Sequence, residues 1–202
     1  RSREALFQGI ASSPGVGIGR AVLVSSSTDL SAVPERFTKD PAAEIKIFLE
    51  ALKATKRDMR NLGDGLASKL SEEEFALFEV YIRMLDDRSL DREVKDAIKQ
   101  GRAATSAWSS VILKHVRTFK KMDDPYLRER AADVNDLGRR VLGYLQAKDT
   151  EQTSLPRRIV LVGEDLSATA LADIPVSRLV GIISLKGSSN SHMAIVGRAL
   201  GI

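Results

Sequence analysis

The sequence has no cysteine, no long apolar run and little excess charge of either sign. Without cysteine the chain can form neither a disulfide nor a thiolate metal site, and nothing in it points to an oxidising compartment. No stretch approaches the roughly 18 to 20 apolar residues that a membrane-spanning helix needs. The first ten residues, RSREALFQGI, lack the cationic and then apolar layout of a secretory signal. These absences favour a cytoplasmic location.

The charge balance argues against a nucleic-acid partner. The net charge is +4, from 31 Lys and Arg against 27 Asp and Glu. A nucleic-acid-binding protein is expected to gather its excess charge on one face, with aromatic residues among the cations. The most basic run here, KHVRTFKK (Lys114 to Lys121), is short and lies within a helical pattern. At 202 residues and 43% hydrophobic content, the chain can bury the core of one large domain or two modest ones.

Strand patterns occur at both ends of the chain and a helical pattern fills the middle. Near the start, the segment FQGIASSPGVGIGRAVLV (Phe7 to Val24) predicts a strand, a turn and a second strand. Near the end, two runs, Arg157 to Leu166 and Arg178 to Leu185, predict further strands, with a brief helix between them in SATALADIP. From Asp40 to about Lys148 the period is helical. Helix starts are predicted at Asp40-Pro41, at the Ser71 to Glu74 capping box and at Asp124-Pro125, and another helix carries Ala104, Trp108, Ile112 and Phe119.

This order predicts one discontinuous α/β domain with an α-helical bundle domain inserted in it. The α/β domain would comprise residues 1–30 and 150–202, and the inserted domain residues 31–149. Two independent domains would leave the strands of Phe7 to Val24 without a sheet to join, and an isolated hairpin is at best marginally stable.

His192 is the residue whose surroundings point most clearly to chemistry. Gly187 permits a tight turn, the next residues supply helix N-caps, and Met193 to Leu200 has helical composition. His192 would thus lie at a helix N-terminus, where the dipole disfavours protonation of the ring and free amides can hold a phosphate. A neutral imidazole in this position suits temporary storage of a phosphoryl group, although the same pattern is also typical of a structural cap. A metal site is not expected, because no other ligand is suitably spaced.

Other candidates have a structural alternative that fits better. His115 lies on or beside an apolar stripe, which favours a hydrogen-bonded interface histidine. The glycines of SPGVGIGRAV are expected to serve turns and close packing, because no helix follows that could complete a phosphate loop. The acid-rich helix from Glu72 to Glu79 is typical of a solvated face, or alternatively of a surface that docks a partner.

Three segments together resemble a known family. KGSSNSHMAIVGRALGI (Lys186 to Ile202) resembles the phosphohistidine motif of phosphoenolpyruvate-utilising enzymes, usually Gly-Gly-x-x-Ser-His-x-Ala-Ile-x-Ala-Arg. His192 matches the phosphorylated histidine, whereas Lys186 and Gly197 depart from the motif. GIASSPGVGIGRAVLV and DPYLRERAADVNDLGRRVL resemble the first strands and the last inserted helix of enzyme I of the phosphotransferase system, the phosphoenolpyruvate–protein phosphotransferase. The three segments occur in the family's order and span nearly the whole chain.

The resemblance implies a swivelling phosphohistidine domain with an inserted carrier-binding domain. His192 would take a phosphoryl group from phosphoenolpyruvate and pass it to a histidine of an HPr-like phosphocarrier. A carboxy-terminal barrel would bind phosphoenolpyruvate and magnesium, and no cofactor or metal is implied for the present residues. The implied supporting residues are Ser167, where the family has a threonine that hydrogen-bonds the histidine, and Ser189, Ser191 and Arg198. The implied carrier contacts are Phe78, Tyr81, Met84 and Leu85, with Arg130 assisting.

The resemblance also bears on the branch of the family and on the extent of the chain. Two features favour the nitrogen-regulatory branch. One is the pair of departures from the motif, and the other is a start that resembles a helix running in from an earlier sensory domain. We expect a monomeric fragment that exchanges phosphate with a phosphorylated carrier and that phosphoenolpyruvate alone does not charge. Two alternatives stay open. One is the swivelling domain of a pyruvate phosphate dikinase or phosphoenolpyruvate synthase, which lacks such an insertion, and the other is a non-catalytic interaction module in which His192 is a cap.

Overall fold

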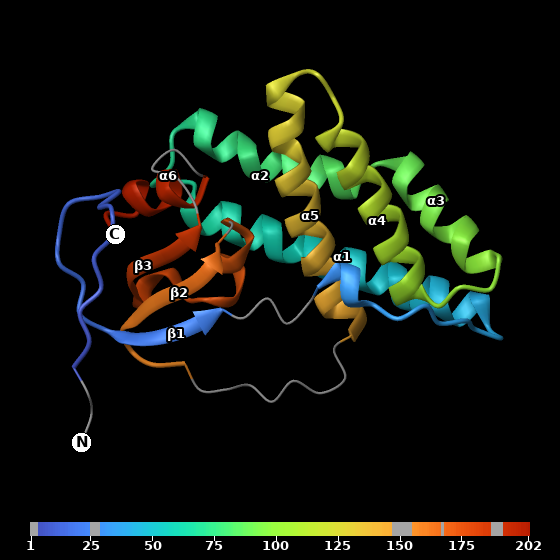
Figure 1. The fold of residues 1–202 in the computed structure, drawn as a ribbon, viewed down its shortest axis with the longest axis horizontal. Helices are drawn as coiled ribbons and strands as arrows, with labels where there is room; N and C mark the ends of the chain where they lie inside the picture. Colours follow the sequence, from blue (N-terminus) through green and yellow to red (C-terminus); the bar gives the residue numbers. More distant parts are fainter. Residues whose placement is uncertain (1–3, 25–28, 147–154, 167, 187–191) are drawn as a thin grey trace.

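The computed structural model describes residues 4–24, 29–146, 155–166, 168–186 and 192–202. Five helices form a body beside a small parallel sheet, and a short sixth helix lies next to that sheet (Figure 1). The helical body comprises α1 (Pro41–Leu66), α2 (Glu72–Leu85), α3 (Arg88–Lys99), α4 (Ala104–Lys120) and α5 (Pro125–Gln146). The remaining part comprises β1 (Arg20–Val24), β2 (Ile159–Asp165), β3 (Leu179–Lys186) and α6 (His192–Ala199), with short 3-10 turns at Leu30–Ala32, Ala168–Asp173 and Val176–Arg178. No helix within the described residues is long and apolar enough to cross a membrane.

Two of the predicted helix starts are confirmed by their capping hydrogen bonds, and the third is confirmed because α5 begins at Pro125. The Asp40 side chain accepts from the amide of Ala43 at 3.0 Å, just ahead of the proline that begins α1. Ser71 and Glu74 form both halves of a capping box, with the Glu74 carboxylate accepting from the Ser71 amide at 2.8 Å. Each bond satisfies an amide that has no partner within the helix, which fixes where α1 and α2 begin.

The core of the helical body is centred on Trp108 of α4. Its side chain is fully buried, its ring lies 5.7 Å from that of Phe48 of α1, and its indole N–H donates to the backbone oxygen of Gly138 of α5 at 2.8 Å. At Gly138 an added Cβ would lie 2.5 Å from a methyl carbon of Ile112, so a side chain at this position would collide with α4. The indole contact and the glycine thus allow α4 and α5 to pack closely.

The sheet joins the two ends of the chain. Its strands are parallel in the order β1-β2-β3, with Val22 of β1 opposite Leu161 of β2 and Leu161 opposite Ile182 of β3. Close packing of the glycines ahead of β1 is confirmed. A Cβ at Gly17 would lie 2.2 Å from the backbone oxygen of Val180, and one at Gly19 would lie 2.8 Å from a side-chain carbon of the same valine. The first segment can approach β3 only because these residues lack side chains.

One prediction for the secondary structure needs correction, and one helix was not predicted. The first strand expected within Phe7 to Val24 is wrong, because residues 4–19 form no strand and their apolar side chains are exposed, Phe7 at 90% and Ile10 at 94%. A β-branched pattern needs a neighbouring strand, and β1 pairs with β2 alone in the described sheet. Helix α3 was not singled out by the sequence, whereas the brief helix expected in SATALADIP is confirmed as the 3-10 helix Ala168–Asp173. The domain boundaries at 30/31 and 149/150 stay a prediction.

An ionic cluster holds the 3-10 turn Ala168–Asp173 against the helical body. Arg140 of α5 lies 2.7 Å from a carboxylate oxygen of Asp58 of α1 and 2.7 Å from one of Asp173. Tyr144 also donates its hydroxyl to Asp58. Burial alone would lower the pKa of Arg140, but these two carboxylates outweigh it and raise the pKa. The cluster therefore fixes the sheet-side segment on α1 and α5.

Candidate functional site

His192 is the first residue of α6, directly after the segment that follows β3. The first amides of a helix have no intrahelical acceptor, and the helix dipole places partial positive charge there. The side chain of His192 is 42% exposed, so a phosphoryl donor can reach its ring. The sequence-based prediction that His192 begins this helix is confirmed.

The imidazole of His192 faces a buried carboxylate on the helical body. Its Nδ1 lies 3.4 Å from Oδ1 of Asp133, which belongs to α5 and has a side chain only 8% exposed. The two residues come from different parts of the molecule, since α6 lies beside the sheet and α5 belongs to the helical body (Figure 1). The candidate site is therefore at the junction between these parts.

Two further side chains complete the surroundings of Asp133. The hydroxyl of Tyr81, on α2, donates to Oδ1 at 3.2 Å, and the guanidinium of Arg130 donates to Oδ2 at 2.8 Å. Burial would raise the pKa of Asp133, but the hydrogen bond and charge of His192, together with those of Arg130, outweigh it and lower the pKa. Burial and the charge of Asp133 raise the pKa of Tyr81, so its hydroxyl stays a donor. At neutral pH the cluster contains a carboxylate that accepts from Tyr81 and Arg130 and faces Nδ1 of His192.

The geometry distinguishes the two ring nitrogens of His192. Nδ1 faces Asp133, and no described residue hydrogen-bonds Nε2. A ring nitrogen without a protein partner can attack an electrophilic phosphorus if it carries the lone pair. The arrangement thus offers Nε2 as the nucleophile and Nδ1 as the anchored atom.

The predicted supporting residues are placed in part. Ser167, Ser189 and Ser191 lie outside the described residues. Arg198 lies in the last turn of α6, where its guanidinium is 3.5 Å from the backbone oxygen of Ser12. This contact connects α6 to the first segment of the chain and does not involve the imidazole.

The predicted carrier contacts on α2 need correction. Phe78 and Tyr81 are each 1% exposed and Leu85 is 4% exposed, so these side chains contact the core and not a partner. The family resemblance suggested these contacts, but the apolar face of α2 packs on α1 and α5. Met84 is partly exposed. Arg130, the other predicted contact, is only 16% exposed and its guanidinium is engaged by Asp133.

The other histidine lies at a helix–helix interface, as expected, but its buried Nε2 has no hydrogen-bond partner among the described residues, so the expected hydrogen bond is not confirmed. Nε2 of His115 lies 3.3 Å from a carboxylate oxygen of Glu93 on α3, and the side chain is half-buried between α3 and α4. Lys114 contacts the same carboxylate at 2.9 Å. His115 thus connects two helices of the body.

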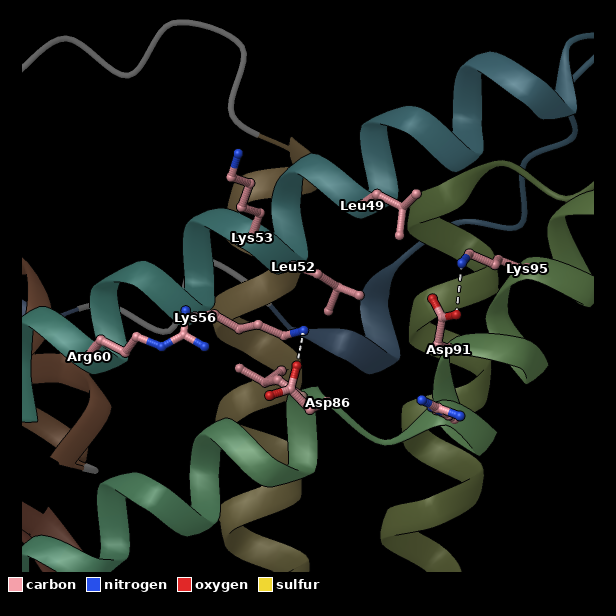
Figure 2. A pocket seen from close by; sticks show the side chains of 10 residues that line it. Leu49, Leu52, Lys53, Lys56, Arg60, Asp86, Asp91 and Lys95 are labelled. Carbon is pink, nitrogen blue, oxygen red and sulfur yellow. Dashed lines mark hydrogen bonds and ion pairs between the residues drawn. The ribbon is translucent and has the colours of Figure 1, made fainter.

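A charged groove lies elsewhere on the helical body. It has a volume of about 320 Å³ and is lined by α1 and the adjoining parts of α2 and α3. In Figure 2 the ammonium group of Lys56 points to Asp86 and that of Lys95 to Asp91, at 2.5 and 2.7 Å. Both carboxylates are thus neutralised within the groove. None of the lining residues belongs to α6 or to the cluster around Asp133, so the groove is separate from the candidate site.

The described residues show no group of three or more histidine and acidic side chains that could hold a metal ion.

The two departures from the phosphohistidine motif lie at the end of β3 and within α6. Lys186 ends β3 and contacts Glu164 at 2.6 Å on the surface. A Cβ at Gly197 would lie 3.5 Å from Ile182, which is ordinary contact, so the alanine of the motif would also fit.

Asp133 is the residue of the candidate site that the sequence did not reveal. It lies within the segment that carried the family resemblance, three residues after Arg130, a spacing typical of a surface ion pair on a helix. Its burial and its contact with His192 depend on how α5 packs against the part of the molecule that contains the sheet and α6.

Comparisons with known proteins agree on one family. Residues 8–130 match the family model "PEP-utilising enzyme, N-terminal", and residues 155–202 match "PEP-utilising enzyme, mobile domain". A phosphoenolpyruvate-dependent phosphotransferase system protein of Escherichia coli is 34% identical over 99% of this chain and 27% of its own length. A phosphoenolpyruvate-protein phosphotransferase of Staphylococcus epidermidis is 31% identical over 98% of this chain and 35% of its own length. The chain thus spans about a third or less of these relatives.

Solved structures of similar proteins extend the agreement to the fold. The N-terminal domain of "Enzyme 1 - Nitrogen" is 35% identical and matches with a TM-score of 0.74 over 95% of this chain and 79% of that one. A solution structure of enzyme I matches with a TM-score of 0.73 at 26% identity. The family models, the relatives and the shared fold agree, and the chain belongs to the phosphoenolpyruvate-utilising enzymes, with the N-terminal domain of enzyme I as its structural counterpart.

Proposed function

We propose that this chain carries the phosphohistidine step of a phosphoenolpyruvate–protein phosphotransferase. In this step His192 receives a phosphoryl group that derives from phosphoenolpyruvate and passes it to a histidine of an HPr-like phosphocarrier. The observation that carries the proposal is the position of His192. Its ring is partly exposed at a helix N-terminus, with Nδ1 facing the Asp133 carboxylate and Nε2 hydrogen-bonded by none of the described residues.

The transfer balances with the groups present. On charging, the lone pair of Nε2 forms a bond to phosphorus, and the donor leaves with the electron pair of the bond that breaks. On transfer to the carrier, the bond between Nε2 and phosphorus breaks, its electrons return to the imidazole, and a nitrogen of the carrier histidine forms the new bond. Histidine suits both directions because its ring nitrogen is a nucleophile and also a good leaving group, so the protein mainly positions the group and stabilises charge.

We further propose that the sheet and α6 belong to a swivelling domain, that the nitrogen-regulatory branch supplies the carrier, and that the protein is cytoplasmic. The match to the N-terminal domain of "Enzyme 1 - Nitrogen", with its 35% identity, supports the branch. Binding of phosphoenolpyruvate and magnesium is assigned to a part of the family's longer chains that the present residues do not match.

The exposed face of α2 supports carrier docking. Since the apolar residues of this helix are buried, the docking face would consist of its polar side chains, among them Glu72, Glu73 and Glu79, which are exposed. An acidic face favours a carrier whose active-site surface is basic, through charge complementarity and faster encounter.

The experiment is phosphoryl exchange with a matched pair of histidine variants. The chain is incubated with phosphorylated HPr and, separately, with its phosphorylated nitrogen-branch homologue, and the acid-labile mass gain is followed with time. Wild type and His115→Gln should gain the group, faster with the nitrogen-branch carrier, and His192→Ala should not. A gain by His192→Ala, or no gain by folded wild type with either carrier, would refute the proposal. Phosphoenolpyruvate alone should give no gain.

A further inference from the structure

We propose that Asp133 is a positioning residue for His192, whose carboxylate keeps a proton on Nδ1 so that the lone pair lies on Nε2. This inference rests on the proposed function, in which Nε2 is the nucleophile. Asp133 belongs to α5 of the helical body, and the proposal gives it a role in the reactivity of His192 on α6. The argument depends on which atom of the carboxylate meets which donor.

The two oxygens of Asp133 have different partners. Oδ2 accepts from the guanidinium of Arg130 at 2.8 Å. Oδ1 accepts from the hydroxyl of Tyr81 at 3.2 Å and lies 3.4 Å from Nδ1 of His192. Tyr81 is buried and its pKa is raised, so its hydroxyl keeps its proton and donates. The carboxylate can therefore offer His192 only an acceptor.

An acceptor facing Nδ1 selects one tautomer of the neutral ring. The tautomer with the proton on Nδ1 can donate to Oδ1, whereas the other would place two lone pairs against each other. The selected tautomer has its lone pair on Nε2, the nitrogen without a described protein partner. The same carboxylate would stabilise the ring once Nε2 is bonded to phosphorus, because Nδ1 keeps its proton and the ring becomes more positive.

The position of Arg130 gives the proposal a sharp test. Asparagine at position 133 would have nearly the shape of aspartate but a single acceptor oxygen. Arg130 can only donate, so this oxygen would turn to Arg130 and the amide NH₂ would face Nδ1. An NH₂ group donates, which favours the tautomer with the proton on Nε2. Asp133→Asn should therefore invert the tautomer and remove the lone pair from the reacting nitrogen.

The same reasoning predicts a rescue. In Arg130→Met/Asp133→Asn the guanidinium is absent, and the amide oxygen is free to turn toward Tyr81 and His192. The proton should then return to Nδ1. Arg130→Met alone keeps the carboxylate opposite Nδ1 and should keep the wild-type tautomer. A residue that merely stabilised the fold would not give this reversal.

The experiment measures the ¹⁵N chemical shifts of the His192 ring at a pH of about 8.5, where an ordinary histidine is neutral. We expect the proton on Nδ1 in wild type, Arg130→Met and the double variant, and on Nε2 in Asp133→Asn. Phosphoryl gain from the carrier should fall by about a hundredfold or more in Asp133→Asn, as when the wrong histidine tautomer is imposed in serine proteases. In the double variant the gain should partly recover. Asp123→Asn, which changes an exposed aspartate away from the site, is the matched control and should behave as wild type.

An Nε2-protonated ring in wild type would overturn the proposal. So would an unchanged tautomer in Asp133→Asn, or a double variant in which the tautomer stays inverted. If Asp133→Asn does not fold, the wild-type and Arg130→Met spectra still decide, because both must show the proton on Nδ1. The tautomer is measured without phosphate, so absence of phosphoryl gain in wild type would refute the proposed function separately.

Discussion

Replacing Arg140 by methionine should destabilise the protein by about 2 kcal/mol. Arg140 is 12% exposed and bridges Asp58, which is 14% exposed, and Asp173, which is 68% exposed. Removing one partner of a buried ion pair typically costs about 3 to 5 kcal/mol, because the other charge stays buried. The expected loss here is smaller. Asp173 can be solvated by water, and Asp58 keeps the hydrogen bond from Tyr144.

The assay is urea unfolding at pH 7, with a double-mutant cycle to isolate the interaction. Asp58→Asn removes the buried charge that Arg140→Met leaves unpaired. The double variant should therefore lose less free energy of unfolding than the sum of the single variants, by about 1 kcal/mol or more. Arg83→Met is the matched control. Arg83 is exposed and lies 3.7 Å from Glu79, so its loss should cost less than about 1 kcal/mol.

A loss below about 1 kcal/mol for Arg140→Met, or strict additivity in the cycle, would refute this reasoning. It would mean that the cluster does not hold the Ala168–Asp173 turn on the helical body, and that apolar packing fixes this junction.

Three further predictions follow from packing and charge. In Gly138→Ala, overpacking against Ile112 at 2.5 Å should outweigh the gain in helix propensity and lower stability by about 1 to 2 kcal/mol; a rise in Tm would contradict this. Gly197→Ala meets only ordinary contact at 3.5 Å and should stabilise α6 by up to about 1 kcal/mol, so a lower Tm would contradict it. Because the pKa of Asp133 is lowered in the folded protein, its contribution to stability is present above about pH 4 and is lost as the pH falls below that value. The stability difference between wild type and Asp133→Asn, measured by urea unfolding at pH 7 and pH 3, should therefore shrink in acid, and a constant difference would be evidence against it.

Local signals predicted much of the helical body. The Asp40 side chain, just ahead of the proline that begins α1, and the pair Ser71 and Glu74 form their hydrogen bonds within one helical turn, so the sequence alone determines where α1 and α2 begin. Helix α3 was not singled out because its sequence is mostly charged and buries only Val94 and Ile98. Its apolar residues, Leu90, Val94, Ala97 and Ile98, nevertheless recur at helical spacing, so a helix could have been predicted there.

Predictions that depended on distant partners were less successful. The segment around Phe7 and Ile10 has strand composition, but a strand also needs a neighbour, and no local pattern shows whether one exists. The apolar residues of α2 were predicted to contact a carrier from the family resemblance, and the sequence does not show that α1 and α5 cover them. For the same reason His192 was identified from its neighbours along the chain, but Asp133 was not. Their contact depends on the packing of α5 against the sheet-side part.

The most direct test of the account is to locate the phosphoryl group on the chain. After exchange with a phosphorylated carrier, ¹⁵N and ³¹P NMR of the histidine-labelled protein identifies which histidine and which nitrogen is bonded to phosphorus. The account predicts Nε2 of His192, with the proton on Nδ1 facing Asp133. Phosphorus on Nδ1 of His192, or on His115, would contradict it.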